Sequence, residues 1–319
     1  MAPSPKRALV PTLLLLFLGA CAQEEGDTGA PPPQEDSLAG TSPPVVLEDA
    51  SGRVHRFQDP PRRLVSLVPS VSRTLHALGA SDRLVGRTDF DTASFLAHLP
   101  SVGGGLDPSL EALVALDPDL VIRFAGESDT SIPRRLNELG IPHFSVRPDG
   151  VEDVRRMIRR LGLLTGRSQE ADVLLQAMDR ELADIRRRVR NRDRVRVAYL
   201  LGGRPPWVAG PGTFINELII VAGGQNVFQD LETLYGPVSV EEILARDIDL
   251  LLAPRGSELD LSPSSVPLHR VSPNLELPGP DLAHSARALA RILHPQAFQG
   301  LLNKAGGAAP PVPQSFRGP

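Results

Sequence analysis

Residues 108–122 read PSLEALVALDPDLVI, and residues 238–252 read VSVEEILARDIDLLL. The two stretches share six identical positions, which are Ser109/Ser239, Glu111/Glu241, Ala115/Ala245, Asp117/Asp247, Asp119/Asp249 and Leu120/Leu250. Both fit one local structure: a serine caps a short helix, a glutamate lies near the positive end of the helix dipole, and a buried strand follows an Asp-x-Asp turn. A chain that builds this unit twice is predicted to have two similar lobes with a cleft between them. The alternative is that two ordinary helix–turn–strand units have similar residues by convergence.

The N-terminal residues have the pattern of an export signal. Lys6 and Arg7 precede an apolar run over residues 8–18, which is too short to span a bilayer as a stable helix. The run ends in Leu-Gly-Ala-Cys, which resembles a bacterial lipobox, so we expect residues 1–20 to be removed and Cys21 to be lipidated. The alternative is an ordinary signal followed by an incidental cysteine. The predicted location is periplasmic or otherwise extracytoplasmic, as a membrane-anchored lipoprotein.

Composition separates a folded region from its two ends. Residues 21–44 contain almost no large apolar side chains and are predicted to form a disordered tether, and residues 299–319 are predicted to form a flexible tail. About 250 residues remain, which is enough for two lobes of ordinary size. The formal charge is −4 and nothing resembles a basic nucleic-acid footprint, and the single cysteine excludes an internal disulfide.

Strand and helix patterns alternate through the folded region, which predicts an α/β fold with parallel sheets covered on both faces. A hairpin is expected over residues 45–57. Strands are expected over residues 64–68, 84–88, 120–124, 143–146, 195–202, 250–253 and 268–271. Helices are expected over residues 69–78, 131–139, 151–164, 214–221 and 281–293, and each copy of the repeat is expected to supply one more.

A longer helix is predicted from Ser168 to about Arg190. Its apolar stripe consists of Leu174, Met178, Leu182, Ile185 and Val189, at spacings of three or four residues. We expect this helix, within a segment over residues 166–193, to connect an N-terminal lobe over residues 45–165 to a C-terminal lobe over residues 194–298. The alternative is an ordinary amphipathic helix inside one lobe.

Four motifs, in the same order along the chain, resemble the class III periplasmic substrate-binding proteins, which serve ABC importers of cobalamin, iron-siderophores and haem. They are SLVPSVSRTLHALGASDRLVG (66–86), GGGLDPSLEALVALDPDLVI (103–122), WVAGPGTFINELIIVAGGQNVF (207–228) and PVSVEEILARDIDLLL (237–252). The resemblance covers about residues 45–295. It implies two Rossmann-like lobes joined by one long helix, a ligand held between them, and a permease with its ATPase as partners.

The same resemblance implies how the protein docks. In cobalamin binders of this family each lobe presents a surface glutamate to arginines of the permease, and the matching positions here are Glu111 and Glu241. An arginine and a carboxylate form a directional, bidentate pair, so two such pairs would fix the orientation of the whole protein. The alternative for each glutamate is simple stabilisation of a helix N-terminus.

Ligands of open α/β sheets bind at the carboxyl ends of strands, and several aromatic residues are expected in loops there. By resemblance, Phe90, Phe124, Trp207 and Tyr235 match ligand contacts of cobalamin binders; flat rings in a cleft can stack on a large ligand ring. The alternative is local loop packing. Polar ligand groups are expected to meet hydroxyl and backbone N–H donors at helix N-termini, from Ser70, Gly210, Gly212 and Thr213.

Some residues depart from the family pattern. Gly105 stands where cobalamin binders often have an aromatic residue, and Arg73 stands where the family often has a glutamate. Arg87 and Arg123 lie near strand ends, where they would face an anionic ligand such as a siderophore or a haem propionate, or else be solvated surface arginines. The stretch over residues 256–267 is also shorter and richer in Ser and Pro than in the family.

The sequence argues against an enzyme. It has no G-x-G-x-x-G, Walker or G-x-S-x-G pattern and no cysteine in the folded region, and its seven histidines form no ligand-spaced pair on a helix. We therefore predict a monomeric binding protein without cofactor, catalytic residues or bound metal, whose ligand is a corrinoid. The alternative is a ferric siderophore or haem. A nucleotide-binding enzyme and a zinc or manganese binder are remote alternatives.

Overall fold

A computed structural model describes residues 43–126, 131–259 and 265–301, which belong to one compact unit. The signal, Cys21, nearly all of the tether and all but the start of the tail lie outside the described residues. The described part begins with the expected hairpin, in which β1 (Val45–Glu48) pairs antiparallel with β2 (Val54–Phe57). One oxygen of the Asp49 carboxylate accepts hydrogen bonds from the backbone N–H groups of Ser51 and Arg53, which closes the turn.

The first lobe is built on a parallel four-stranded sheet in the order β4-β3-β5-β6. The strands are β3 (Leu64–Ser66), β4 (Leu84–Gly86), β5 (Leu120–Phe124) and β6 (His143–Val146).

Helices cover both faces of this sheet, as successive side chains of a strand point to opposite faces. Leu120 and Ile122 of β5 belong to the core that contains helices α1 and α4, whereas Val121 belongs to a separate core with helices α2 and α3. The helices are α1 (Pro69–Ala77), α2 (Leu110–Ala115), α3 (Ser131–Glu138) and α4 (Val151–Thr165). Every strand residue of β3 and β6 is buried, including the polar side chains of Ser66, His143 and Ser145.

The second lobe has the predicted parallel sheet and, in addition, two antiparallel strands that the sequence did not predict. Its parallel part has the order β9-β7-β11-β12, and β8 and β10 add antiparallel strands beside β7. The short connection over residues 203–206 can return the chain only antiparallel to β7, since a parallel strand needs a long crossover. The strands are β7 (Val195–Gly202), β8 (Trp207–Ala209), β9 (Gly224–Asn226), β10 (Tyr235–Pro237), β11 (Leu250–Pro254) and β12 (Leu268–Val271).

Helices also cover both faces of this second sheet. Val197 and Leu252 share a core with helices α6 and α8, and Ala198 and Leu251 share another with helix α7. The helices are α6 (Phe214–Val221), α7 (Val240–Ala245) and α8 (Leu282–Leu293), and a 3₁₀ turn, η3 (Pro273–Glu276), precedes α8.

The repeated sequence occupies equivalent places in the two lobes. In chain order, each parallel part has the strand order 2-1-3-4, and the repeat supplies the helix before the third strand and that strand itself. The Asp119 carboxylate accepts hydrogen bonds at 2.8 Å from the backbone N–H groups of Arg62 and Arg63, just before β3. The Asp249 carboxylate accepts one at 2.8 Å from the N–H of Arg196 in β7. The second Asp of each copy therefore joins its own strand to the first strand of its sheet.

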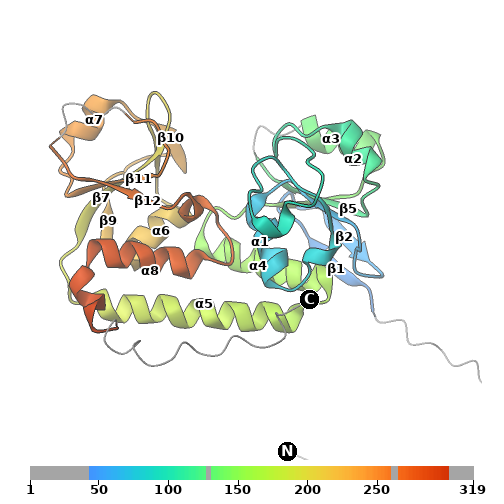
Figure 1. The fold of residues 1–319 in the computed structure, drawn as a ribbon, viewed down its shortest axis with the longest axis horizontal. Coiled ribbons are helices and arrows are strands. Elements are labelled where there is room, and N and C mark those ends of the chain that lie inside the picture. Colours follow the sequence, from blue (N-terminus) through green and yellow to red (C-terminus); the bar gives the residue numbers. More distant parts are fainter. Residues whose placement is uncertain (1–42, 127–130, 260–264, 302–319) are drawn as a thin grey trace, which may run out of the picture. The chain divides into compact units, whose positions relative to one another are not determined.

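The long helix α5 (Ser168–Val189) connects the two sheets and packs against both lobes (Figure 1). It contacts α4 of the first lobe and α6 and α8 of the second, and one continuous core includes side chains of all four helices. Its buried face consists of Ala171, Leu175, Met178, Leu182, Ile185 and Val189. The expected stripe is thus correct except near its start, where Leu175 is buried and Leu174 is only partly covered.

Truncating the buried face of α5 should destabilise the whole unit. We expect Leu182→Ala, at a fully buried side chain, to lower the free energy of unfolding by about 2–5 kcal/mol, because a cavity remains in the shared core. The matched control is Val173→Ala on the exposed side of α5, where the side chain is 65% exposed and the expected change is within about 0.5 kcal/mol. Urea denaturation followed by circular dichroism measures both; equal stabilities of the two variants would contradict the shared core.

Candidate functional site

The carboxyl ends of adjacent strands β3 and β5, and of β7 and β11, are the positions where the strand order of each sheet reverses. Open α/β sheets bind ligands outside the carboxyl ends at such points. Ser70 follows β3, Phe124 ends β5, and Trp207 follows the turn after β7. The topology therefore gives three of the residues singled out by sequence the location expected for a ligand site.

Ser70 lies at the second residue of α1 and is almost fully buried. Its side-chain oxygen has no hydrogen-bond partner among the described residues. Gly279, in the segment before α8, lies directly against it: a Cβ at Gly279 would be 3.2 Å from the Ser70 carbonyl oxygen. The second lobe thus covers the start of α1, and it leaves a buried hydroxyl without the hydrogen bond that such groups normally make.

The four predicted aromatic contacts differ in exposure. Phe90 is 68% exposed and Trp207 is 46% exposed, whereas Phe124 and Tyr235 are partly buried. Phe90 lies next to Gly104, and the Trp207 ring lies against Gly203, with 3.1 Å between the ring Cδ1 and a Cβ built at that glycine. Each exposed ring therefore lies against a glycine and offers free surface for stacking.

The sequence led us to expect Trp207 and Tyr235 in loops, but neither residue lies in one. They lie in the antiparallel strands β8 and β10, where Tyr235 pairs with Ala209 and Trp207 pairs with Pro237. The sequence concealed these strands because each has only three residues, too few to show a period of two.

Two of the predicted polar donors have local partners. The Gly210 N–H donates to the Leu234 carbonyl oxygen at 2.7 Å. The Thr213 hydroxyl is fully buried; it donates to the Gly210 carbonyl oxygen and caps α6 by accepting from the Asn216 N–H. These bonds account for both groups within the lobe. Gly212 is exposed with a φ of +80°, a conformation that glycine adopts without strain.

Two sets of contacts join the lobes beside these residues. In the first, the Phe214 N–H donates to the Asp149 carbonyl oxygen at 2.5 Å, and the Val151 N–H donates to Oε1 of Glu217 at 3.2 Å. A Cβ at Gly150 would lie 2.7 Å from the same carboxylate oxygen, so a side chain there would displace the end of Glu217. The N-termini of α4 and α6 are therefore linked directly.

In the second set, Arg73 of α1 pairs with Asp281 at 2.9 Å and donates to the Asn274 side chain at 3.3 Å. The arginine that departs from the family pattern thus connects α1 to the segment before α8. The other two arginines near strand ends are also engaged and are not solvated surface groups. Arg87 donates to the carbonyl oxygens of Thr88 and Leu99, and Arg123 is 5% exposed beside His143.

Sequence reasoning missed a carboxyl group at the same junction. Glu276 is half-buried at the end of η3, and its Oε1 accepts a hydrogen bond from the Tyr199 hydroxyl at 3.3 Å. Burial raises the pKa of Glu276 to about 7, and the hydrogen bond from Tyr199 only partly opposes this. Burial, Asp149 and Glu276 also raise the pKa of Tyr235, which places this phenol near both acids. Glu276 belongs to no motif, so no sequence signal marked it.

The two predicted docking glutamates lie at equivalent, exposed positions. Glu111 is the second residue of α2 and Glu241 the second residue of α7, and each helix is capped by its serine: Ser109 accepts from the Ala112 N–H and Ser239 from the Glu242 N–H. Neither glutamate has an ion-pair or hydrogen-bond partner within the described part of the chain. Both carboxylates are therefore available to an outside partner.

The surface beside Glu111 is hollowed. A shallow depression of about 710 Å³ lies between α2 and α3. It is lined by Leu110, Glu111, Val114, Ala115, Arg135, Glu138 and Leu139.

Among the described residues, no three His, Cys, Asp or Glu side chains are grouped as they would be around a metal ion. None of the helices in that part of the chain is both long and apolar enough to cross a bilayer.

Comparison with known proteins gives one consistent picture. Residues 64–261 match the family described as periplasmic binding protein. A Halobacterium salinarum protein named as a cobalamin-binding protein is 33% identical over 76% of this chain and 68% of its own length. A Bacillus subtilis protein named as an ABC transporter substrate-binding lipoprotein is 27% identical over 92% of this chain and 99% of its own. The crystal structure of a periplasmic haem-binding protein from Pseudomonas aeruginosa is 25% identical, covers 74% of this chain and 93% of its own, and superposes with a TM-score of 0.65.

The stability contributed by Glu276 should depend on pH. Because its pKa is raised from 4.5 to about 7, the folded protein keeps a proton that the unfolded chain has lost between these values. The contribution of Glu276 to the free energy of unfolding should therefore fall as pH rises from about 4.5 to about 7 and change no further above that range. His143, whose pKa is lowered to about 4, contributes an opposite slope over part of this range. We therefore expect the stability of Glu276→Gln relative to the unmodified protein to rise between these pH values. Urea denaturation at a series of pH values measures it.

The control is Glu232→Gln, at an exposed position outside the junction, which should retain the slope of the unmodified protein. If Glu276→Gln also retains that slope, the carboxyl group titrates near its ordinary value and is not buried in solution.

Proposed function

We propose that this chain, which belongs to the periplasmic binding protein family, captures a corrinoid between its two lobes and delivers it to the permease of an ABC importer. The cobalamin-binding relative from Halobacterium salinarum supports this ligand class. The proposed ligand contacts are Ser70, Phe90, Phe124, Trp207, Gly212 and Tyr235. Gly210 and Thr213 shape the same loop through their internal hydrogen bonds.

The proposed choice among ligand classes depends on the charge of the lobe junction. Two carboxyl groups, Asp149 and Glu276, lie near Tyr235. Two arginines of the junction are engaged: Arg147 pairs with Asp149 at 2.6 Å, and Arg73 pairs with Asp281. The Glu276 carboxyl, with its pKa raised to about 7, is partly protonated near neutral pH, and the Asp149 carboxylate is already paired with Arg147. A ligand that presents carboxylates here therefore has neither Arg147 nor Arg73 left to pair with it, whereas neutral amides can hydrogen-bond to the junction.

The lobe junction therefore favours a corrinoid over haem or a ferric siderophore, because the corrin ring carries amide side chains whereas haem carries propionates. A neutral amide can donate to Asp149 or Glu276 without bringing a second negative charge. The two exposed rings, Phe90 and Trp207, supply apolar surface from separate lobes for the faces or edges of a large macrocycle.

Haem is the second candidate, and a specific observation favours it. The solved haem-binding protein from Pseudomonas aeruginosa has the same fold at 25% identity. In addition, Gly105 stands where an aromatic wall is common in cobalamin binders. A Cβ at this position would lie 2.4 Å from the Leu67 carbonyl oxygen, so the backbone here excludes any side chain, including that aromatic.

The membrane anchor is part of the same proposal. A lipid on Cys21 followed by a flexible segment would keep the binding unit near its transporter in the extracytoplasmic space. The Bacillus subtilis relative, which is described as a lipoprotein, supports this arrangement. We further propose that the protein acts as a monomer and has no catalytic role.

Calorimetric titration of the protein with cyanocobalamin, haemin and a ferric siderophore tests the ligand. We expect tight binding of cyanocobalamin and much weaker binding of the two anionic iron chelates. Trp207→Ala should weaken corrinoid binding by about 1–3 kcal/mol, because a large stacking surface is lost. Leu163→Ala, at an exposed apolar residue of α4, is the control and should bind as the unmodified protein does. Binding of haemin alone would reverse the order of the two candidates.

The docking role of the two glutamates is tested separately. The double variant Glu111→Ala with Glu241→Ala should retain its corrinoid affinity but lose most uptake into cells, since two fixed charge pairs with the permease are removed. The control is Glu48→Ala with Glu232→Ala, which removes the same charge from exposed sites outside α2 and α7. Normal uptake by the first double variant would leave Glu111 and Glu241 as helix-stabilising residues only.

A further inference from the structure

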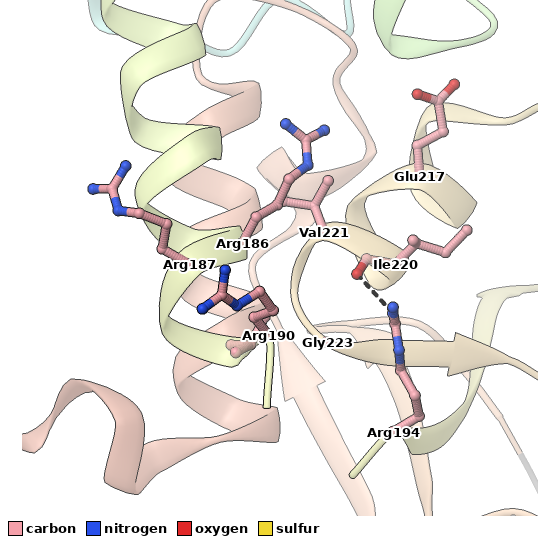
Figure 2. Close-up of a pocket in the computed structure, with 9 residues that line it drawn as sticks. Arg186, Arg187, Arg190, Arg194, Glu217, Ile220, Val221 and Gly223 are labelled. Atoms are coloured by element: carbon pink, nitrogen blue, oxygen red, sulfur yellow. Dashed lines mark hydrogen bonds between the residues drawn. The ribbon is translucent and has the colours of Figure 1, made fainter. Parts of the chain in front are cut away.

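A basic cavity lies at the C-terminal end of α5, apart from the residues assigned to ligand binding and docking (Figure 2). Its volume is about 430 Å³. It is lined by Arg186, Arg187, Val189, Arg190, Arg194, Glu217, Ile220, Val221 and Gly223. Figure 2 shows that its arginines come from two sides, from the C-terminal end of α5 and from the residue just before β7.

The local sequence concentrates positive charge here. Residues 186–196 contain seven arginines and one acid, Asp193, in a chain whose formal charge is −4. Basic residues in the last turn of a helix stabilise its dipole, and this accounts for Arg186 and Arg187. It does not account for Arg194, which belongs to the chain entering β7 and still faces the same cavity.

The cavity contains both fixed and free guanidinium groups. Arg194 donates to the carbonyl oxygens of Ile220 and Gly224, each at 3.1 Å, so its position is set by the α6–β9 turn. Arg187 pairs with Asp184 at 2.9 Å. Arg186 and Arg190, in contrast, have no hydrogen bond or ion pair within the part of the chain that the structure describes.

The negative charge on the cavity wall does not balance these groups. Among the described lining residues Glu217 is the single acid, and its Oε1 already accepts the Val151 N–H across the lobe junction. Within the described part of the chain, the guanidinium groups of Arg186, Arg190 and Arg194 have no acidic partner; they repel one another around this cavity, and the repulsion is relieved when an anion enters. The remaining lining, which includes Val189, Ile220 and Val221, is apolar.

We propose that this cavity binds a phosphate-bearing anion. Guanidinium groups form paired, bidentate hydrogen bonds with phosphate oxygens, and Arg186 and Arg190 have all their donors available for this. The apolar side chains suit the carbon atoms of a phosphate ester. The phosphate has two sources with this chemistry, a soluble phosphate compound or the headgroup of an anionic phospholipid. The site is independent of the corrinoid proposed above.

Two measurements on the full chain with Cys21→Ala, which cannot be lipidated, distinguish the sources. The first is calorimetric titration with inorganic pyrophosphate. The second is co-sedimentation with vesicles of phosphatidylcholine that contain or lack phosphatidylglycerol. We expect binding in at least one arm, weakened tenfold or more by Arg186→Gln with Arg190→Gln. Binding of pyrophosphate identifies a soluble phosphate ligand, and binding of phosphatidylglycerol vesicles alone identifies a lipid headgroup.

The matched control is Arg62→Gln with Arg134→Gln, which removes the same charge from exposed positions elsewhere and should bind as the parent protein does. Thermal melting followed by circular dichroism verifies that each variant is folded. If the glutamine pair misfolds, Arg186→Lys with Arg190→Lys replaces it. The lysine pair keeps the charge but loses the bidentate geometry, so it should still bind more weakly than the parent protein. The proposal is overturned if neither probe binds the parent, or if the control pair and the cavity pair lose binding equally.

Discussion

The packing of α5 against helices of both lobes is the constraint on which the rest of the structure depends. Leu175, Met178, Leu182 and Ile185 are buried in one core that also contains side chains of α4, α6 and α8. A helix of 22 residues extends for about 33 Å, which is enough to reach both lobes without a flexible joint. The relation between the two sheets is therefore set by apolar packing along a rigid element, and large hinge motion would have to expose part of this core.

The direct contacts between the lobes act within this frame. The bonds from Phe214 to Asp149 and from Val151 to Glu217 join two helix N-termini, and the pair between Arg73 and Asp281 joins α1 to the segment before α8. These polar bonds contribute less than the shared core, since exposed ion pairs add about 0–1 kcal/mol each. These bonds instead determine which polar groups lie beside the proposed ligand contacts. The buried hydroxyl of Ser70 and the carboxyl of Glu276 are two of these polar groups.

Charge is distributed unevenly over the molecule, and each region has a separate physical meaning. The lobe junction has carboxyl groups and engaged arginines, which suits a neutral ligand. The first turns of α2 and α7 each present a free carboxylate, which suits a basic partner. The end of α5 has arginines in excess around a cavity, which suits an anion. The small net charge of the chain conceals these differences, because opposite excesses cancel in the sum.

The sequence by itself determined the two-lobed α/β architecture, the long helix and the equivalence of Glu111 and Glu241, because periodicity and a repeated capping pattern are local properties of the chain. It did not determine the antiparallel strands that hold Trp207 and Tyr235, which are too short to show a pattern. Only the tertiary structure decided the partners of Arg73, the environment of Glu276 and the bonds from Arg194 to the α6–β9 turn. Each of these depends on segments distant in sequence, whose approach is fixed by packing and leaves no mark in the neighbouring residues.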